Sequence, residues 1–249
     1  MLVDVHAHME HKAFEPDLTE VLERAKQAGL TAVISSGTNY ELNVKTLDLA
    51  KKFPIIKPAL GLYPADALRL SEEEFEKSLD FIKAHRKEII AIGEIGLDFQ
   101  EAKGKEEEQE KNFSRLLQLS EELKLPVIVH SRKAEEKVIE VLEGFKAKKV
   151  VMHCFSGSMS LVKRAEDNGW MFSVPCNVVF SEHFQNLVRQ VSVSQLLTET
   201  DAPFLPPVKG QRNEPMNVAF TVKKIAEIKG LDPEEVEKIV FMNFKKIFR

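Results

Sequence analysis

The amino-acid sequence predicts an α/β fold, a single (β/α)8 TIM barrel with an additional C-terminal helix, as one domain over residues 1–249. Short β-type runs alternate with longer amphipathic helical runs along the whole chain. At 249 residues, α/β barrels commonly form a single domain, and no linker rich in proline, glycine or serine divides the sequence. A doubly wound open sheet gives the same alternation and is the alternative.

The first half of the chain contains four predicted strands and the helices between them. Each strand is a short run of apolar or β-branched residues, and the four runs are Leu2–His6, Thr31–Ser35, Ile55–Leu60 and Ile89–Gly93. The helices repeat apolar residues every three or four positions and cover Asp17–Ala28, Glu41–Lys52 and a segment that starts at Ser71. Gly29 ends the first helix, and Ser71 with Glu74 forms a capping box at the start of the third.

The second half continues the alternation. The charged stretch Glu101–Glu110, interpreted as a solvated loop and helix start, leads into a helix that runs to about Leu123. The remaining strands are predicted at Pro126–His130, Lys149–His153, Trp170–Val174 and Gln195–Thr198. The remaining helices are predicted at Ala134–Phe145, Ser158–Asn168, Glu182–Val191, Pro215–Ile228 and Pro233–Phe248. Asp232 is the expected N-cap of the last helix, with Glu235 completing the cap.

Composition and charge exclude several classes of protein. Apolar residues make up 43% of the chain and charged residues 30%, so a sizeable core can form. The net charge of −4 argues against a protein that coats duplex nucleic acid by charge alone, although it permits a local site for a nucleic-acid end. Two cysteines, Cys154 and Cys176, are too few for a disulfide framework or a thiolate zinc site.

We expect a cytoplasmic protein with no membrane partner. The N-terminus has no basic segment, and Asp4, His6 and His8 interrupt its only apolar run, which argues against a signal peptide. No window approaches the roughly 18 apolar residues of a membrane span. No heptad or long apolar stripe indicates an obligate protein partner.

The informative functional signal is the position of histidines and carboxylates relative to the predicted strands. Six of them lie at or just after strand ends: His6, His8, Glu94, His130, His153 and Asp201. In a barrel these ends share the face on which active sites are built. Imidazole and carboxylate together suit first-row divalent metals. Each histidine alone could be an ordinary core or surface residue, but their joint occurrence predicts a metal site.

The six residues can fill two neighbouring metal sites if Glu94 bridges them. We assign His6, His8, Glu94 and Asp201 to one metal, and Glu94, His130 and His153 to the other. Two metals about 3.5–4 Å apart can clamp a phosphoryl group or an amide during hydrolysis. Asp201 would also accept the proton of the attacking water, so Asp201 and Glu94 are the predicted catalytic residues.

The remaining residues near these positions have weaker signals. His11, His85 and His183 fall away from the predicted strand ends and are expected to be ordinary solvent-facing residues. Asp4 shares the strand parity of His6, so it could support a ligand from behind.

Six motifs occur in a fixed order along the chain. They are Val3-Asp4-Val5-His6-Ala7-His8, Gly93-Glu94-Ile95-Gly96-Leu97-Asp98, Val129-His130-Ser131-Arg132, His153-Cys154-Phe155-Ser156-Gly157, Glu199-Thr200-Asp201-Ala202-Pro203 and Arg212-Asn213-Glu214-Pro215. With these motifs the chain resembles the TatD family of metal-dependent deoxyribonucleases, within the amidohydrolase-like barrels. The resemblance extends from residue 3 to residue 215. The motifs that contain Glu94 and Asp201 are specific, whereas many amidohydrolases share the His-x-His start.

The resemblance implies a TIM barrel that hydrolyses phosphodiester bonds with two divalent metal ions. Family members are typically 3′ to 5′ exonucleases on single-stranded DNA that depend on Mg²⁺ or Mn²⁺, and four histidines also tolerate Zn²⁺. The family's metal ligands carry over to the six positions given above. The implied partner is a nucleic-acid substrate. An amidohydrolase or D-aminoacyl-tRNA deacylase that uses the same metals is the alternative, and a non-catalytic binding module would not need six converging ligands.

Three further residues are candidates for substrate binding: Arg132, Tyr63 and Arg212. Arg132 lies two residues beyond His130 and could hold a phosphate bidentately. After the third strand, nucleases of the family often have Gly-x-His-Pro, whereas this chain has Tyr63 in place of that histidine. Tyr63 could donate a hydrogen bond and stack on a base, or be a half-buried loop residue. Arg212 and Lys209 could add positive charge after Asp201, or be ordinary loop residues.

Overall fold

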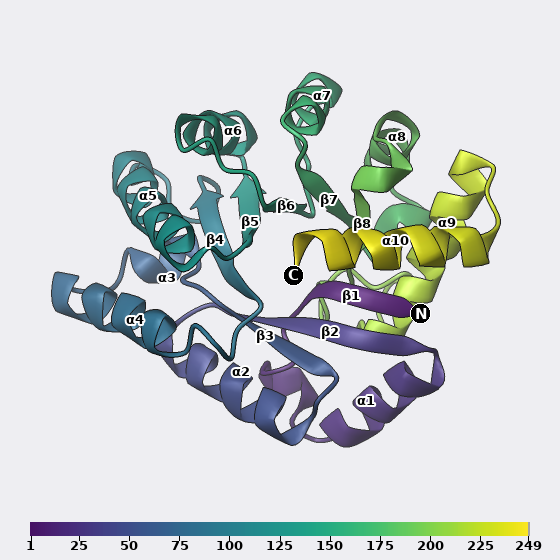
Figure 1. The fold of residues 1–249 in the computed structure, drawn as a ribbon, viewed down its shortest axis with the longest axis horizontal. Coiled ribbons are helices and arrows are strands. Elements are labelled where there is room, and N and C mark those ends of the chain that lie inside the picture. The colour runs from purple at the N-terminus through teal and green to yellow at the C-terminus, as the bar shows by residue number, and fades with distance from the viewer. Residues whose placement is uncertain (249) are drawn as a thin grey trace.

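The computed structural model describes residues 1–248 and shows eight parallel strands in sequence order, each hydrogen-bonded to the next (Figure 1). The strands are β1 (Leu2–Ala7), β2 (Leu30–Gly37), β3 (Ile56–Leu60), β4 (Ala91–Asp98), β5 (Val127–Arg132), β6 (Val150–His153), β7 (Met171–Val174) and β8 (Leu196–Thr198). The Thr198 hydroxyl donates to the Val3 carbonyl at 2.6 Å, and the Asp201 N–H donates to the His6 carbonyl at 2.9 Å. These bonds join β8 to β1, so the predicted barrel is confirmed.

Helices surround the strands on the outside of the barrel (Figure 1). They are α1 (Leu18–Gln27), α2 (Tyr40–Lys52), α3 (Pro64–Ala67), α4 (Glu72–Ala84), α5 (Glu106–Leu123), α6 (Glu135–Gly144), α7 (Met159–Asp167), α8 (Glu182–Gln190) and α9 (Val218–Lys229). The additional C-terminal helix is α10 (Pro233–Ile247), which packs against β1 and β8. Its buried Asn243 donates to the carbonyls of Val193 and Leu196 at 2.9 and 2.8 Å, at the start of β8. This amide fixes α10 against the strand.

The strands are buried because the helices cover one face and the barrel interior covers the other. All residues of β1, β4, β6, β7 and β8 are buried. Within residues 1–248, no helix is both long and apolar enough to cross a membrane.

The largest difference from the sequence prediction is in β4. The strand was expected at Ile89–Gly93, but it covers Ala91–Asp98, so Glu94 lies inside it rather than after it. Gly93 and Gly96 are typical of a loop, but in the structure they lie within β4 and face β5. A Cβ atom at Gly96 would lie 2.0 Å from the His130 carbonyl oxygen, and one at Gly93 would lie 2.7 Å from the Ile128 Cβ. The glycines therefore allow close approach of β5.

The other element ends agree with the prediction within about two residues, and several short helices were missed. These are α3 and the 3-10 helices η1 (Lys12–Phe14), η2 (Cys176–Val179) and η3 (Val193–Gln195). The helix expected at Pro215–Ile228 begins with a 3-10 turn, η4 (Pro215–Asn217), and continues as α9. The capping box of Ser71 and Glu74 is present. Asp232 caps the last helix by accepting from the Glu234 N–H, so its cap contact is to Glu234 rather than Glu235.

Candidate metal centre

Four donor atoms meet at the carboxyl end of the barrel. The Nε2 atoms of His6 and His8 lie 3.3 Å apart. Glu94 Oε2 is 3.4 Å from the Nε2 atom of His6 and 3.6 Å from that of His8. Asp201 Oδ1 is 3.5 and 3.3 Å from the same two atoms. Donors at such spacings match a tetrahedral ion with bonds of about 2.1 Å, so this set fits a divalent cation.

Glu94 faces two groups of ligands with its two oxygens. Whereas Oε2 is directed to His6 and His8, Oε1 lies 2.8 Å from His130 Nδ1 and 4.0 Å from His153 Nε2. The His153 ring is stacked on His6 with 3.7 Å between centroids. This is the arrangement that a bridging carboxylate requires. The structure therefore brings all six predicted ligands together, although His130 contacts Glu94 directly and that contact would have to open for a second cation.

Two groups of donors are tight enough to hold an ion within residues 1–248. They are His6, Glu94 and His153, and His6, His8 and Asp201. His6 is common to both groups and its side chain is fully buried. The two groups therefore share His6, whereas Glu94 belongs to one of them and His130 to neither.

Hydrogen bonds on the outer nitrogen of two histidines leave Nε2 available to a metal. The Nδ1 atom of His8 lies 3.0 Å from the Ser36 carbonyl oxygen, and that of His153 lies 2.8 Å from Glu199 Oε2. Because these oxygens accept, each Nδ1 carries the hydrogen. His130 is reversed: its Nε2 atom lies 3.1 Å from Asp98 Oδ2, and its Nδ1 atom faces Glu94.

The charge distribution favours cations. Burial raises the pKa of Glu94, but hydrogen bonds from His130 and His6 outweigh it and hold the pKa well below its usual range. The pKa of Asp201 is also lowered, because its hydrogen bond from His8 outweighs burial. Burial lowers the pKa of His130, yet hydrogen bonds to Asp98 and Glu94 raise it to about 9. Negative potential at this centre thus stabilises positive charge.

Sequence reasoning assigned no role to two carboxylates behind the ligands. Glu199 is fully buried, holds His153 and accepts a hydrogen bond from the Ser173 hydroxyl. Glu10 is 1% exposed, and its carboxylate accepts from the Ser35 hydroxyl at 2.7 Å and lies 3.4 Å from His8 Nδ1. Glu10 follows His8 by two residues and Glu199 precedes Asp201 by two. Their closeness in sequence to two predicted ligands was therefore the available signal.

Asp4 supports the centre through the backbone, in agreement with its predicted position behind the ligands. It is fully buried, and its Oδ1 atom accepts from the N–H groups of His6 at 3.2 Å and Thr200 at 3.0 Å. It thereby fixes the ligand His6 relative to the segment that carries Asp201.

The three other histidines were expected to face solvent, but all are half-buried. His11 is the one that matters here, because it lines the metal pocket and its Nδ1 atom accepts from the Ala13 N–H at 3.1 Å as the cap of η1. His85 and His183 bind the carbonyls of Phe81 and Phe155 and lie outside the pocket.

The centre opens into a pocket of about 450 Å³. It is lined by His8, Glu10, His11, Thr38, Leu42, Tyr63, Asp66, Glu94, Glu101, His130, Arg132, His153, Asp201 and Phe204. Arg132 is exposed at the end of β5, and its guanidinium has no side-chain partner among the described residues. It can therefore contact a ligand in the pocket.

Tyr63 lies in this pocket with its hydroxyl already engaged. The hydroxyl donates to Asp98 Oδ2 at 2.6 Å and lies 3.2 Å from Glu101 Oε2. Burial and the hydrogen bond to Asp98 both raise the pKa of this phenol. The ring stands 5.0 Å from His130 in a T-shaped arrangement. Because the hydroxyl hydrogen is used within the protein, the ring is the part offered to a ligand.

The structure does not bring Arg212 into the pocket, contrary to the predicted substrate contact. Its guanidinium donates to both oxygens of Asp17 at 2.7 and 2.6 Å and to Glu214 at 2.9 Å. It also lies 4.8 Å from the centre of the Phe14 ring. Because these carboxylates bind the guanidinium, Arg212 stabilises the fold and is not available to a substrate.

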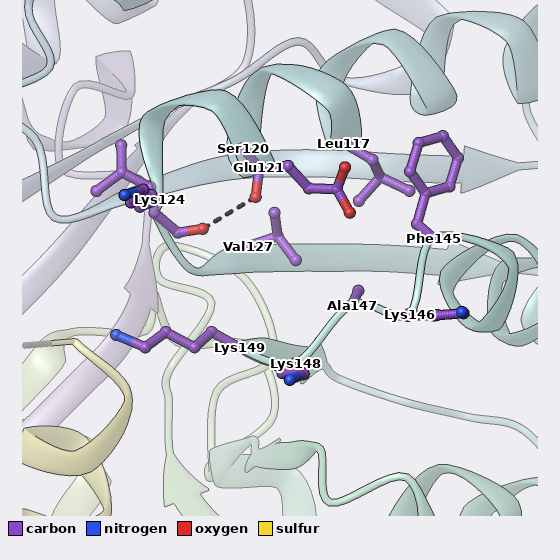
Figure 2. A pocket seen from close by; sticks show the side chains of 11 residues that line it. Leu117, Ser120, Glu121, Lys124, Val127, Phe145, Lys146, Ala147, Lys148 and Lys149 are labelled. Atoms are coloured by element: carbon purple, nitrogen blue, oxygen red, sulfur yellow. Dashed lines mark hydrogen bonds between the residues drawn. The ribbon is translucent and has the colours of Figure 1, made fainter.

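A larger cavity of about 600 Å³ lies at the opposite end of the barrel, where β5 begins at Val127 (Figure 2). Figure 2 shows an apolar floor that includes Leu117 and Phe145, with lysine side chains around it. Among residues 1–248, Glu121 is the only carboxylate in its lining, and no histidine or cysteine of this part of the chain lines it. The metal-ligand chemistry thus belongs to the smaller pocket.

Comparison with known proteins decides the family. The family model described as TatD related DNase matches residues 3–249. The chain belongs to this family. The assignment that the six sequence motifs predicted is thereby confirmed, and with it the expectation of a hydrolytic enzyme of the deoxyribonuclease class.

Several relatives match this chain over nearly the whole length of both proteins. An uncharacterized metal-dependent hydrolase of Methanocaldococcus jannaschii is 37% identical over 99% of this chain and 96% of its own. Human deoxyribonuclease TATDN3 is 34% identical over 99% and 94%. The 3′-5′ ssDNA/RNA exonuclease TatD of Salmonella typhimurium is 28% identical over 99% and 98%. The crystal structure of the TatD homolog YJJV of Escherichia coli superimposes with a TM-score of 0.93, 28% identity and coverage of 99% and 97%.

Proposed function

We propose that this protein is a divalent-metal-dependent nuclease that removes nucleotides from the 3′ end of single-stranded DNA. The convergence of six nitrogen and oxygen ligands on both sides of Glu94, in a pocket that also holds Arg132, carries the proposal. The Salmonella relative named as a 3′-5′ exonuclease supports the direction of digestion.

Two cations would be held by the donor sets that share Glu94. His6, His8 and Asp201 complete the first set, and His130 and His153 complete the second. Bound there, Mg²⁺ or Mn²⁺, or alternatively Zn²⁺, would polarise a phosphoryl oxygen and acidify a water molecule. Glu94 holds the two sets at a fixed separation.

Protein side chains supply the remaining functions. Asp201 accepts the proton of the attacking water, because its side chain is 16% exposed to the pocket whereas that of Glu94 is only 4% exposed. The planar guanidinium of Arg132 can bind two phosphate oxygens and orient the scissile bond. The Tyr63 ring provides an apolar wall beside His130.

End-labelled single-stranded oligonucleotides test this proposal directly. Metal-stripped protein resupplied with Mg²⁺, Mn²⁺ or Zn²⁺ should shorten the strand from the 3′ end. Asp201→Asn should abolish activity, whereas Asp48→Asn, a matched change of an exposed aspartate on α2, should leave it unchanged. Absence of cleavage with every metal, from protein that binds metal, would contradict the proposal.

Metal stoichiometry tests the bridged site independently of activity. Calorimetric titration of the stripped protein should reveal two ions per chain. Glu94→Gln removes a ligand common to both sets, so it should weaken both binding events. His130→Gln should weaken only one. A single ion per chain in the wild-type protein would rule out the two-metal proposal.

A deacylase acting on D-aminoacyl-tRNA is the second candidate, and one observation favours it. Beyond the predicted metal ligands, two carboxylates that reach solvent line the pocket: Asp66 and Glu101. Such groups could bind the ammonium of an aminoacyl ester, which DNA lacks. Release of amino acid from D-aminoacyl-tRNA, with DNA left intact, would make this the function.

A further inference from the structure

An exposed phenyl ring stands at the mouth of the metal pocket. Phe204 lines the pocket and is 50% exposed. Its ring is T-shaped toward the ligand His8, at 6.1 Å between centroids, and toward His11, at 5.6 Å. The ring therefore lies beside the predicted reaction centre. None of the roles proposed above explains an exposed ring at this position.

The loop that carries Phe204 is fixed in place. The Phe204 N–H donates to the carbonyl of the ligand Asp201 at 2.8 Å. Asn213, which is fully buried, donates through its backbone to the Pro203 carbonyl at 3.1 Å and through its side chain to the Leu205 carbonyl at 3.1 Å. Residues on both sides of Phe204 are thus tied to one buried amide. A loop held in this way loses little backbone conformational entropy when a ligand binds.

Lys209 of the same loop lies against a second exposed ring, which belongs to a different loop. Phe180, at the end of η2, is 50% exposed, and the Lys209 ammonium lies 5.4 Å from the centre of its ring. Proteins that bind single-stranded nucleic acid combine exposed aromatic rings, on which bases stack, with cations that contact phosphates. In this protein Phe204 provides a ring and Arg132 a cation in the pocket itself, whereas Phe180 and Lys209 lie outside its lining.

We propose that Phe204 stacks on the base of a nucleotide that flanks the scissile phosphate. The inference rests on the proposed nuclease function and adds a specificity-determining residue to that site. Because every base has a flat face, stacking selects nucleic acid with unpaired bases and tolerates any sequence. A phosphodiester that has lost the base at this position should therefore bind less well.

Steady-state kinetics of the metal-loaded enzyme test the inference. The substrates are a short oligothymidylate and two copies in which one nucleotide flanking the terminal linkage is abasic. Phe204→Leu keeps an apolar side chain but removes the aromatic face, so KM on the intact strand should rise about 5- to 10-fold with kcat nearly unchanged. Phe204→Trp should restore the wild-type KM. Phe220→Leu changes a 44%-exposed phenylalanine of α9 outside the pocket lining and should have no effect.

Abasic substrates separate stacking from structural support. Wild-type enzyme should have a higher KM for one of the two abasic strands, and Phe204→Leu should lose this difference. An unchanged KM for Phe204→Leu on the intact strand would overturn stacking while leaving the nuclease function in place. Equal losses on intact and abasic strands would also overturn it, since Phe204 would then only support the pocket. Failure of the wild-type enzyme to degrade any strand would instead refute the proposed function.

Discussion

The orientation of one predicted ligand, His130, depends on a residue that is not itself a predicted ligand. Asp98 accepts from His130 Nε2 at 3.1 Å and from the Tyr63 hydroxyl at 2.6 Å on the same oxygen. Its other oxygen accepts from two backbone N–H groups, at 2.9 and 2.8 Å, so the carboxylate cannot turn freely. Asp98 thereby assigns the hydrogen of His130 to Nε2 and leaves Nδ1 for coordination.

Replacement of Asp98 should therefore weaken metal binding on the His130 side. We expect Asp98→Asn to reduce affinity for the second ion about 10- to 100-fold, with activity restored in part by excess metal. Tyr63→Phe removes one hydrogen bond to the same oxygen and should have a smaller effect. Calorimetry and activity measured against metal concentration provide the readouts.

Asp66→Asn is the matched control for this prediction. Asp66 lines the same pocket, but its carboxylate contacts Arg69 at 3.0 Å and Asn39 at 3.4 Å rather than a histidine. Wild-type binding of both ions by Asp98→Asn would show that His130 is oriented by other contacts.

At the scale of an element, β4 shows what local sequence can and cannot predict. The apolar residues before Gly93 identified the strand, but its continuation to Asp98 was missed, because two glycines within six residues resemble a turn. Glycine is required at both positions because β5 lies too close to leave room for a Cβ atom. Such contacts join segments distant in sequence, so no local pattern contains them. The convergence of the six candidate ligands was predictable because strand ends of a barrel share one face whatever the exact strand length.

Gly96→Ala should destabilise the protein strongly. The new Cβ atom would lie 2.0 Å from the His130 carbonyl oxygen, and the φ of 146° is one that alanine rarely adopts. We expect a loss of about 1–3 kcal/mol or more in the free energy of unfolding. Gly144→Ala, at the end of α6 with no atom within 4 Å of the new Cβ, should instead gain about 0.5–1 kcal/mol. Equal unfolding midpoints in urea for the two variants would contradict this account of β4.

At the scale of the whole molecule, an ion-pair cluster joins the first helix to the loop that follows the predicted ligand Asp201. Arg24 of α1 binds both oxygens of Glu214, at 2.9 and 2.8 Å, across a separation of 190 residues. Arg212 contacts Glu214 and Asp17 at the same place. Sequence reasoning placed Arg212 at the substrate because its partners could not be found from spacing. The fold brings α1 close to the loop after β8, so Arg212 pairs with Asp17 and Glu214 and does not face the pocket.

This cluster should make stability depend on pH. Burial raises the pKa of Glu214, but hydrogen bonds from Arg24 and Arg212 outweigh it, so the pKa lies below the ordinary value of 4.5. A carboxyl with a lowered pKa in the folded state stabilises the protein above about pH 4.5, and this contribution is lost as the pH falls through the folded-state pKa. At pH 7, Glu214→Gln should cost about 1 kcal/mol, and the difference from wild type should shrink steadily below about pH 4.5.

Urea unfolding at a series of pH values provides the measurement, with Glu227→Gln as the control. Glu227 pairs with Lys224 of the same helix at 2.8 Å, and its side chain is 68% exposed, so solvent screens the pair. Its replacement should change stability little at any pH. If the deficit of Glu214→Gln were the same at neutral and acidic pH, the cluster would stabilise the fold by packing and not by charge.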